Sequence, residues 1–171
     1  QNIDYANYLL AICYYEQIVD EKKDLGSIIK AKESFILLIN NYPNTEYALD
    51  AEFKLDLIND ILASKEMYIG RYYFEKKKWI PAINRFRTVI DDYETTIYVE
   101  EALHRLVELH YKLGLVGESK KYASLLGYNY QSSEWYEESY KILNKNYVKT
   151  AKKVDLEKER SILQKFKDLL K

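Results

Sequence analysis

The chain has 171 residues, of which 47% are hydrophobic and 31% are charged, and its formal net charge is −1. Only five glycines and two prolines are present, too few turn residues for a β-sandwich or barrel of this size, so helices are favoured. The near-neutral charge creates no field that would attract nucleic acid. No stretch approaches 18 consecutive apolar residues, so no transmembrane helix is predicted.

Apolar residues recur at helical spacing through most of the chain and predict an all-α fold of about eight helices. These helices are expected near residues 4–20, 27–42, 45–77, 79–92, 97–113, 116–126, 133–147 and 150–170. The region 45–77 contains no proline and a single glycine, Gly70. It is therefore predicted to be one long central helix, bent near Ser64 or Gly70, with two helices and a hidden corner as the alternative.

The chain contains a single cysteine, Cys13, so an internal disulfide is excluded. Cys13 lies in an apolar stretch of the first expected helix. Because a lone cysteine is among the most frequently buried residue types, we predict a buried structural thiol.

A stretch of the sequence repeats at an offset of 51 residues. The matching pairs are Ala31/Ala82, Phe35/Phe86, Ile39/Ile90, Tyr42/Tyr93, Thr45/Thr96, Tyr47/Tyr98, Ala51/Ala102 and Leu55/Leu106. A weaker third copy follows at a further offset of 37, with the pairs Tyr93/Tyr130, Thr96/Ser133, Tyr98/Trp135 and Leu106/Leu143. Self-similarity at this scale is typical of stacked helical repeats.

Each copy is predicted to form a helix, a short corner and a second helix. In the first copy, Ala31 and Phe35 begin an apolar stripe, and Pro43 in the corner cannot continue the helix. Thr45 is placed to cap the next helix by accepting one of its free amides. One such unit cannot bury both of its faces, so successive units are expected to stack.

The sequence shows no pattern typical of catalysis, metal binding or cofactor binding. His104 and His110 lie six residues apart, which places them about 240° apart around a helix and prevents them from sharing a metal ion. No His-Glu-x-x-His, Cys-x-x-Cys or glycine-rich phosphate motif occurs. The basic run Lys76-Lys77-Lys78 falls at a predicted corner, where charge is simply solvated. We therefore predict neither an enzyme nor a nucleic-acid-binding protein.

The repeat pattern resembles the tetratricopeptide repeat. Gly70, Tyr73, Ala82 and Phe86 fall on the family's Gly, Tyr, Ala and Phe positions, and Glu94 replaces its proline. We predict a tetratricopeptide-like helical-hairpin solenoid over residues 1–147. Residues 148–171 are expected to form a charged C-terminal helix or tail. That tail holds eight lysine or arginine and four aspartate or glutamate residues, so it is either solvated or a basic contact for an acidic partner or lipid headgroups.

Longer motifs resemble the BamD (ComL/YfiO) family of outer-membrane assembly lipoproteins. They are Glu66-Met-x-x-Gly70-Arg-Tyr-Tyr, Ala82-Ile-Asn-Arg-Phe86, the Tyr-x-Thr-Thr corner at 93–96, and Asn41-Tyr-Pro-Asn-Thr. Glu101-Ala-Leu-His-Arg-Leu and Ser133-Glu-Trp-Tyr extend the resemblance toward Leu143. The resemblance implies a non-catalytic scaffold at the periplasmic face of the outer membrane of a Gram-negative bacterium. It would dock on the periplasmic POTRA region of BamA, beside other components of the β-barrel assembly (BAM) machinery.

The chain departs from this family at its start. Family members begin with a signal peptide, a lipid-bearing cysteine and early repeats thought to receive unfolded outer-membrane proteins. We expect the repeats for that substrate, and the lipid anchor that is the family's link to the membrane, to be missing here. The alternative function is a peptide-binding repeat adaptor of another periplasmic or cytoplasmic complex.

The resemblance implies Arg85, in the pair Asn84-Arg85, as the partner-binding residue, with Arg87 and Tyr72 as weaker candidates. Helical spacing independently places Arg85 about 100° from the core residue Phe86, within reach of the surface. The alternative is that Arg85 only pairs with a nearby acid such as Asp92 or Glu75. The neighbouring aromatic residues Tyr73 and Phe74 are predicted to be core, whereas Tyr72 is predicted to be exposed.

Overall fold

The structure is a computed structural model that describes residues 2–18 and 25–144. The expected helix at 150–170 and the last residues of the expected helices 4–20 and 133–147 lie outside these ranges. The described residues form helices and no strand, which confirms the all-α prediction. The helices are α1 (Ile3–Tyr15), α2 (Gly26–Asn41), α3 (Glu46–Glu75), α4 (Trp79–Asp92), α5 (Val99–Lys112), α6 (Val116–Asn129) and α7 (Glu134–Leu143).

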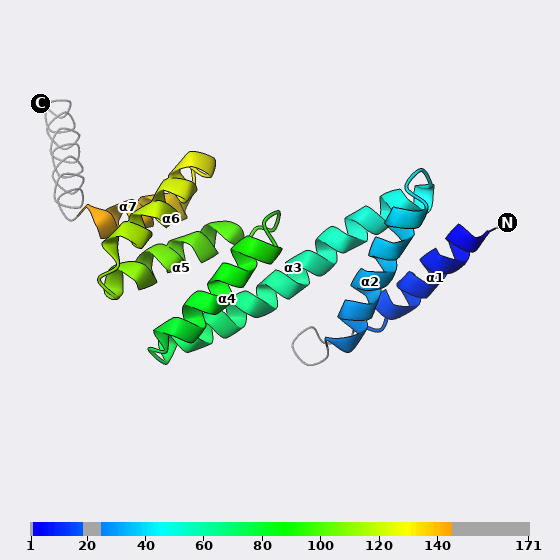
Figure 1. The fold of residues 1–171 in the computed structure, drawn as a ribbon, viewed down its shortest axis with the longest axis horizontal. Helices are drawn as coiled ribbons and strands as arrows, with labels where there is room; N and C mark the ends of the chain where they lie inside the picture. The colour runs from blue at the N-terminus through cyan, green and yellow to red at the C-terminus, as the bar shows by residue number, and fades with distance from the viewer. Residues whose placement is uncertain (1, 19–24, 145–171) are drawn as a thin grey trace, which may run out of the picture. The chain divides into compact units, whose positions relative to one another are not determined.

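The chain divides into two compact units, residues 1–102 and 103–171. The division falls within α5, and each unit has its own helix packing. In the first unit, α3 is a single helix of 30 residues, so the long central helix is confirmed and the hidden corner is not found. Figure 1 shows α2 alongside the N-terminal half of α3 and α4 alongside its C-terminal half.

The predicted repeat is visible in the corners that follow α2, α4 and α6. Tyr42, Tyr93 and Tyr130 end these helices with nearly the same backbone angles: φ is −136°, −136° and −137°, and ψ is 52°, 42° and 50°. Three residues later, the hydroxyls of Thr45 and Thr96 each donate a hydrogen bond of 2.9 Å to the carbonyl oxygen of the corner tyrosine. The offsets of 51 and 37 therefore correspond to one structural unit used three times.

The first and third of these corners also cap the helices that follow them. The Thr45 side chain accepts a hydrogen bond from the backbone amide of Ala48, and the Ser133 side chain accepts one from the amide of Trp135. The capping role predicted for Thr45 is thereby confirmed. A side-chain oxygen at this position satisfies an amide that has no partner within the helix, which fixes where the helix begins.

Two fully buried phenylalanines occupy equivalent positions in the first two copies. Phe35 lies in a cluster that joins α1, α2 and the first half of α3 and includes Ala11, Ala51 and Ile58. Phe86 packs against α3 at Gly70, where an added Cβ would lie 2.6 Å from the ring. Absence of a side chain at Gly70 therefore lets α3 and α4 approach closely.

Several predictions about the ends and faces of helices were wrong. Cys13 is exposed, because α1 buries the side of Ala11 and a residue two positions further along points about 200° away. Helix α1 ends at Tyr15 rather than near residue 20. Helix α6 continues to Asn129, because Gly127 lies within it facing the Tyr136 ring instead of ending it.

The second unit is held by hydrogen bonds from buried polar side chains. Ser119 on α6 donates to the Val107 carbonyl of α5 at 2.8 Å. On α5, His104 Nδ1 lies 2.9 Å from the hydroxyl of Ser139 on α7. Burial of a polar group is costly unless it is paired, so these contacts favour one arrangement of the three helices.

A hydrogen bond between α1 and α3 makes the first unit sensitive to alkaline pH. The Tyr8 hydroxyl donates to Asp50 Oδ2 at 2.7 Å, and this bond, with partial burial, raises the pKa of Tyr8 from 10.0 to about 12. A raised pKa means that the folded state holds the proton more tightly. The stabilisation is thus fully present below pH 10 and is lost as the pH rises through about 12.

We expect the phenolate absorbance titration of the wild type, minus that of Tyr8→Phe, to have its midpoint near pH 12. The subtraction isolates one tyrosine among the 18 of the chain. Asp50→Asn serves as the control, since loss of the carboxylate should return the midpoint toward the ordinary value. A midpoint near pH 10 in the wild-type difference curve would show that the Tyr8–Asp50 bond does not form.

Candidate functional site: the exposed face of the α3–α4 hairpin

The corner between α3 and α4 is fixed by its backbone. Lys77 adopts a positive φ of 57°, and its amide donates to the Phe74 carbonyl while the Lys78 amide donates to that of Tyr73. This pair of bonds is the Schellman arrangement that ends many helices. Gly114, 37 residues later, repeats it with a φ of 78°. The corner sets the register in which α4 returns along α3.

A hollow of about 280 Å³ lies on the hairpin beside this corner. Its lining consists of Tyr73 from α3 and of Ile80, Pro81, Asn84, Arg85 and Thr88 from α4. Ile80 is 62% exposed, and the Thr88 hydroxyl donates to the Asn84 carbonyl at 3.1 Å. The surface thus combines an apolar patch with polar groups, a composition suited to a protein partner.

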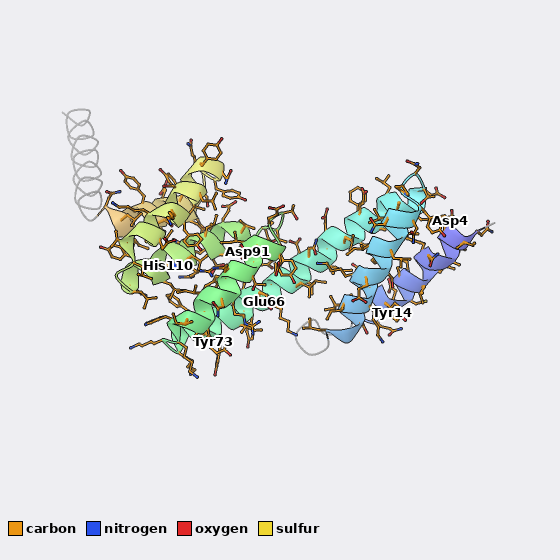
Figure 2. The ribbon with its side chains drawn as sticks, viewed as in Figure 1. Asp4, Tyr14, Glu66, Tyr73, Asp91 and His110 are labelled. Carbon is orange, nitrogen blue, oxygen red and sulfur yellow. The ribbon has the colours of Figure 1, made fainter. Side chains whose placement is uncertain are left out.

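Arg85 lies at the edge of the hollow and is held by α3. Its Nη1 atom lies 3.0 Å and 3.2 Å from the two carboxylate oxygens of Glu66. The Arg85 side chain remains 43% exposed, whereas that of Glu66 is only 18% exposed. Figure 2 shows Glu66 and Tyr73 on α3, with Tyr73 closer to the corner.

The Arg85–Glu66 pair orients the guanidinium without using all of its donors. Glu66 is bound through Nη1, and a guanidinium carries five N–H groups in a planar fork. A partly exposed pair of this kind contributes only about 0–1 kcal/mol to stability. The pair therefore serves to position the Arg85 guanidinium rather than to stabilise the fold. Arg85 can bind a second carboxylate or carbonyl while it stays in contact with Glu66.

A second ion pair holds the same part of α3 to the start of α5. Arg71 donates to both carboxylate oxygens of Glu101, with Nε at 2.9 Å from Oε1. The hydrogen bonds that Arg71 donates to the Glu101 carboxylate raise the pKa of Arg71 despite the opposing effect of burial. Arg71 and Arg85 thus lie on adjacent helices of the first unit, each fixed by one glutamate.

The structure separates the three residues predicted to bind a partner. Arg85 borders the hollow, whereas Tyr72 and Arg87 are exposed but do not line it. The Tyr72 ring packs against Tyr73 at 5.7 Å and lies below Lys76 Nζ at 5.8 Å. Tyr73 and Phe74, predicted to be core, are only partly buried, because they lie in the last turn of α3 beside the corner.

Sequence reasoning missed Glu66, Ile80, Asn84 and Thr88. The last three recur at intervals of four on α4, so helical periodicity could have identified them as one exposed row. The local-acid alternative for Arg85 named Asp92 and Glu75, but the acid in contact is Glu66. It lies 19 residues from Arg85 in the sequence, and only the hairpin register brings the two together.

The histidines and acidic residues of the described ranges do not gather into a metal site. Within residues 2–18 and 25–144, no group of three or more His, Cys, Asp or Glu side chains could hold a metal ion. His104 and His110 are both buried, and His110 Nδ1 lies 2.7 Å from the Leu106 carbonyl oxygen of its own helix. In the same part of the chain, no helix has the length and hydropathy needed to cross a membrane.

Comparison with known proteins agrees with this architecture. The family model described as YfiO, outer membrane lipoprotein, matches residues 1–126. The outer membrane protein assembly factor BamD of Rickettsia prowazekii (strain Madrid E) is 52% identical over 148 residues, covering 85% of this chain and 59% of the relative. The protein of the same name from Caulobacter vibrioides is 46% identical over 147 residues, covering 86% of this chain and 48% of the relative.

A more distant relative, BamD of Neisseria gonorrhoeae, is 32% identical over 121 residues. The chain spans about half to three-fifths of the length of the Rickettsia and Caulobacter relatives. The family match covers α1 to α5 and most of α6, including every residue of the α3–α4 face. The chain therefore belongs to the YfiO family of outer membrane lipoproteins.

Proposed function

We propose that the chain is the partner-docking part of a non-catalytic scaffold of the β-barrel assembly machinery, at the periplasmic face of the outer membrane. The relatives are named as outer membrane protein assembly factors. In this proposal the α3–α4 face docks on the periplasmic POTRA region of BamA, and the assembled complex supports folding and insertion of outer-membrane proteins.

The observation that carries the docking proposal is the exposed Arg85 guanidinium, held by Glu66 at the edge of a partly apolar hollow. An arginine whose position is already fixed loses less conformational entropy when a partner carboxylate binds. Arginine beside an apolar anchor such as Ile80 is also a common composition for the centre of an interface.

The test is the affinity of the full chain for the POTRA region of BamA from the same organism. We expect Arg85→Ala to weaken binding by about 1–3 kcal/mol, an effect typical of an arginine at the centre of an interface. Arg87→Ala is the matched control, since it removes an exposed arginine of the same helix outside the hollow. Calorimetric titration measures both, with circular dichroism to show that the helices are retained.

Two results would count against the proposal. If the wild-type chain does not bind the POTRA region, the role of this chain in docking is wrong. If Arg85→Ala binds as tightly as the wild type, the role stands and the assignment of the site is wrong. Glu66→Gln distinguishes contact from positioning, because it keeps the arginine and removes only the charge that orients it.

A further inference from the structure

The N-terminal half of α3 presents an apolar row to solvent. Leu49, Phe53 and Leu57 recur at intervals of four residues, and each is between 52% and 64% exposed. Helix α2 lies alongside this half of α3 (Figure 1) and covers another side of it, where Ala51 and Ile58 are buried. At 100° per residue the three exposed side chains fall within an arc of about 80°. They form one continuous apolar surface, the α3 ridge, rather than scattered apolar residues.

A row of acidic residues lies next to the α3 ridge. Glu52, Asp56 and Asp60 have the same spacing of four residues and are turned about 60° from the apolar row. Glu52 and Asp56 are exposed, and Asp60 is half-buried. Within the parts of the chain that the structure describes, none of the three takes part in a side-chain hydrogen bond or an ion pair. The α3 ridge is therefore bordered by negative charge.

The two lysines that contact this half of α3 do not neutralise that charge. Lys54 of α3 lies over the ring of Tyr15 on α1, with Nζ 4.9 Å from the ring centroid. It is the only basic residue in the stretch 46–64. Lys32 of α2 donates to the side-chain oxygen of Asn59 at 2.9 Å. Both ammonium groups are thus directed away from the acidic row.

The spacing of the α3 ridge fits a second helix. Rows of side chains at intervals of four are the ridges that pack into the grooves of another helix, with an interaxial angle near −50° in the commonest class. The row spans about 12 Å along the axis, which corresponds to about two turns of a partner helix. An extended peptide would need unpaired backbone groups such as those of a sheet edge, and the side of a helix offers none.

The acidic row determines which kind of helix is complementary. Carboxylates repel phosphate groups, which disfavours lipid headgroups and nucleic acid as partners. Contact with a second copy of this chain would bring two acidic rows into one interface with no cation between them, and juxtaposition of like charges is unfavourable. Lysine or arginine side chains beside an apolar stripe would instead pair with the carboxylates at the rim of the contact.

We propose that the α3 ridge binds an amphipathic helix of a partner protein whose apolar stripe is flanked by lysine or arginine. Phe53, the most exposed of the three apolar side chains, lies at the centre of the contact, and the acidic row orients the bound helix. The proposal is independent of the docking of the α3–α4 face, which uses the C-terminal half of α3.

The test measures binding of a defined probe to the full chain by fluorescence anisotropy. The probe is a fluorescein-labelled peptide of about 18 residues, long enough to form a helix, with leucines on one face and lysines on both sides of them. A matched peptide carries glutamate in place of lysine. We expect the wild-type chain to bind the lysine peptide about tenfold more tightly than the glutamate peptide, or better.

Neutral substitutions locate the apolar contact. Phe53→Gln and Leu57→Gln should each weaken binding of the lysine peptide by about tenfold, with the helix content unchanged in circular dichroism. Ile97→Gln is the matched control, because it removes an exposed apolar side chain of the first unit that lies outside α3. It should change the affinity by less than about twofold.

Charge reversals test the acidic row. The double variant Glu52→Lys with Asp56→Lys should bind the lysine peptide about tenfold more weakly and the glutamate peptide more tightly than the wild type does. The double variant Glu33→Lys with Glu94→Lys makes the same change in net charge at exposed positions off the α3 ridge. It should leave the preference for the lysine peptide in place.

A photoreactive benzophenone amino acid in place of Phe53 extends the test to the partner in cells. We expect it to cross-link to a segment with lysine or arginine on both sides of an apolar helical stripe. The adduct should be lost in the Glu52→Lys, Asp56→Lys variant.

Three results would overturn the proposal. The first is equal affinity of the wild type and Phe53→Gln for the lysine peptide, or equal losses for Phe53→Gln and Ile97→Gln. The second is a dimer, seen by sedimentation or as a cross-link between two copies, that Phe53→Gln dissociates, which would assign the α3 ridge to a second copy. The third is binding to phosphatidylglycerol vesicles that Phe53→Gln abolishes, which would assign it to a lipid surface.

Discussion

Phe86→Ala is expected to lower the free energy of unfolding of the first unit by about 3–5 kcal/mol. The Phe86 ring is fully buried between α4 and α3, so its removal loses the burial of a large side chain and leaves a cavity. The wall of that cavity at Gly70 has no side chain that could turn inward to fill it. The site can collapse only if the two helices move together, which places the cost in the upper part of the range.

Trp79 can report this effect. It begins α4 and packs edge-on against Phe74 at 5.8 Å, so its fluorescence follows the α3–α4 hairpin in a Trp135→Phe background. Urea unfolding of Phe86→Ala in that background should show a lower midpoint. Arg87→Ala, at an exposed position on the same helix, should change the free energy of unfolding by less than about 0.5 kcal/mol. A loss below about 1 kcal/mol for Phe86→Ala would contradict the close packing of the ring against Gly70.

Gly70→Val is expected to destabilise the first unit by about 3 kcal/mol through overpacking. Even the Cβ of the new residue would lie 2.6 Å from Phe86 Cε1, and valine adds two methyl groups beyond it. The higher helix propensity of valine relative to glycine offsets only a few tenths of a kcal/mol of this loss in stability. Because Phe86 is fully buried, its ring cannot move aside without disturbing its other neighbours.

Gly127→Val is the comparison that separates overpacking from a general effect of β-branched substitution. A Cβ at Gly127 would lie 2.7 Å from Tyr136 Cε2, nearly the same approach. Tyr136, however, lines an open groove between α6 and α7 and can rotate toward it. Urea unfolding followed by circular dichroism should therefore show a clearly smaller loss for Gly127→Val. Equal losses would show that the space around the two rings is not the deciding factor.

The repeat corners could be predicted from the sequence because their determinants are local. A tyrosine that ends one helix and a threonine three residues later that bonds to its carbonyl require only short-range hydrogen bonds, and so does the cap that Thr45 adds to α3. The single long α3 helix was predictable for the same reason, since no residue in its interior interrupts the helical pattern. Local chemistry is sufficient wherever the contacts join residues a few positions apart.

The candidate site was predictable only in part. Helical spacing placed Arg85 near the surface, but its partner Glu66 belongs to another helix, and their contact depends on how α4 returns along α3. Cys13 was wrongly predicted to be buried because it lies in an apolar stretch. Ala11 is the buried residue of α1, and Cys13 is exposed. The direction of a side chain in a mostly apolar helix is decided by the neighbouring helix and not by its own segment.

The length of α3 also determines the angle about its axis between the side that contacts α1 and α2 and the side that contacts α4. Ile58 contacts the α1–α2 cluster and Gly70 contacts α4. The separation of 12 positions between them corresponds to about 18 Å along the helix axis and about 120° around it. Insertion of a single residue between them would turn Arg85 by about 100° relative to α2, whereas insertion of seven would change the phase by only about 20°. The continuous helix thus acts as a spacer whose length in residues sets the direction in which the Arg85 face points.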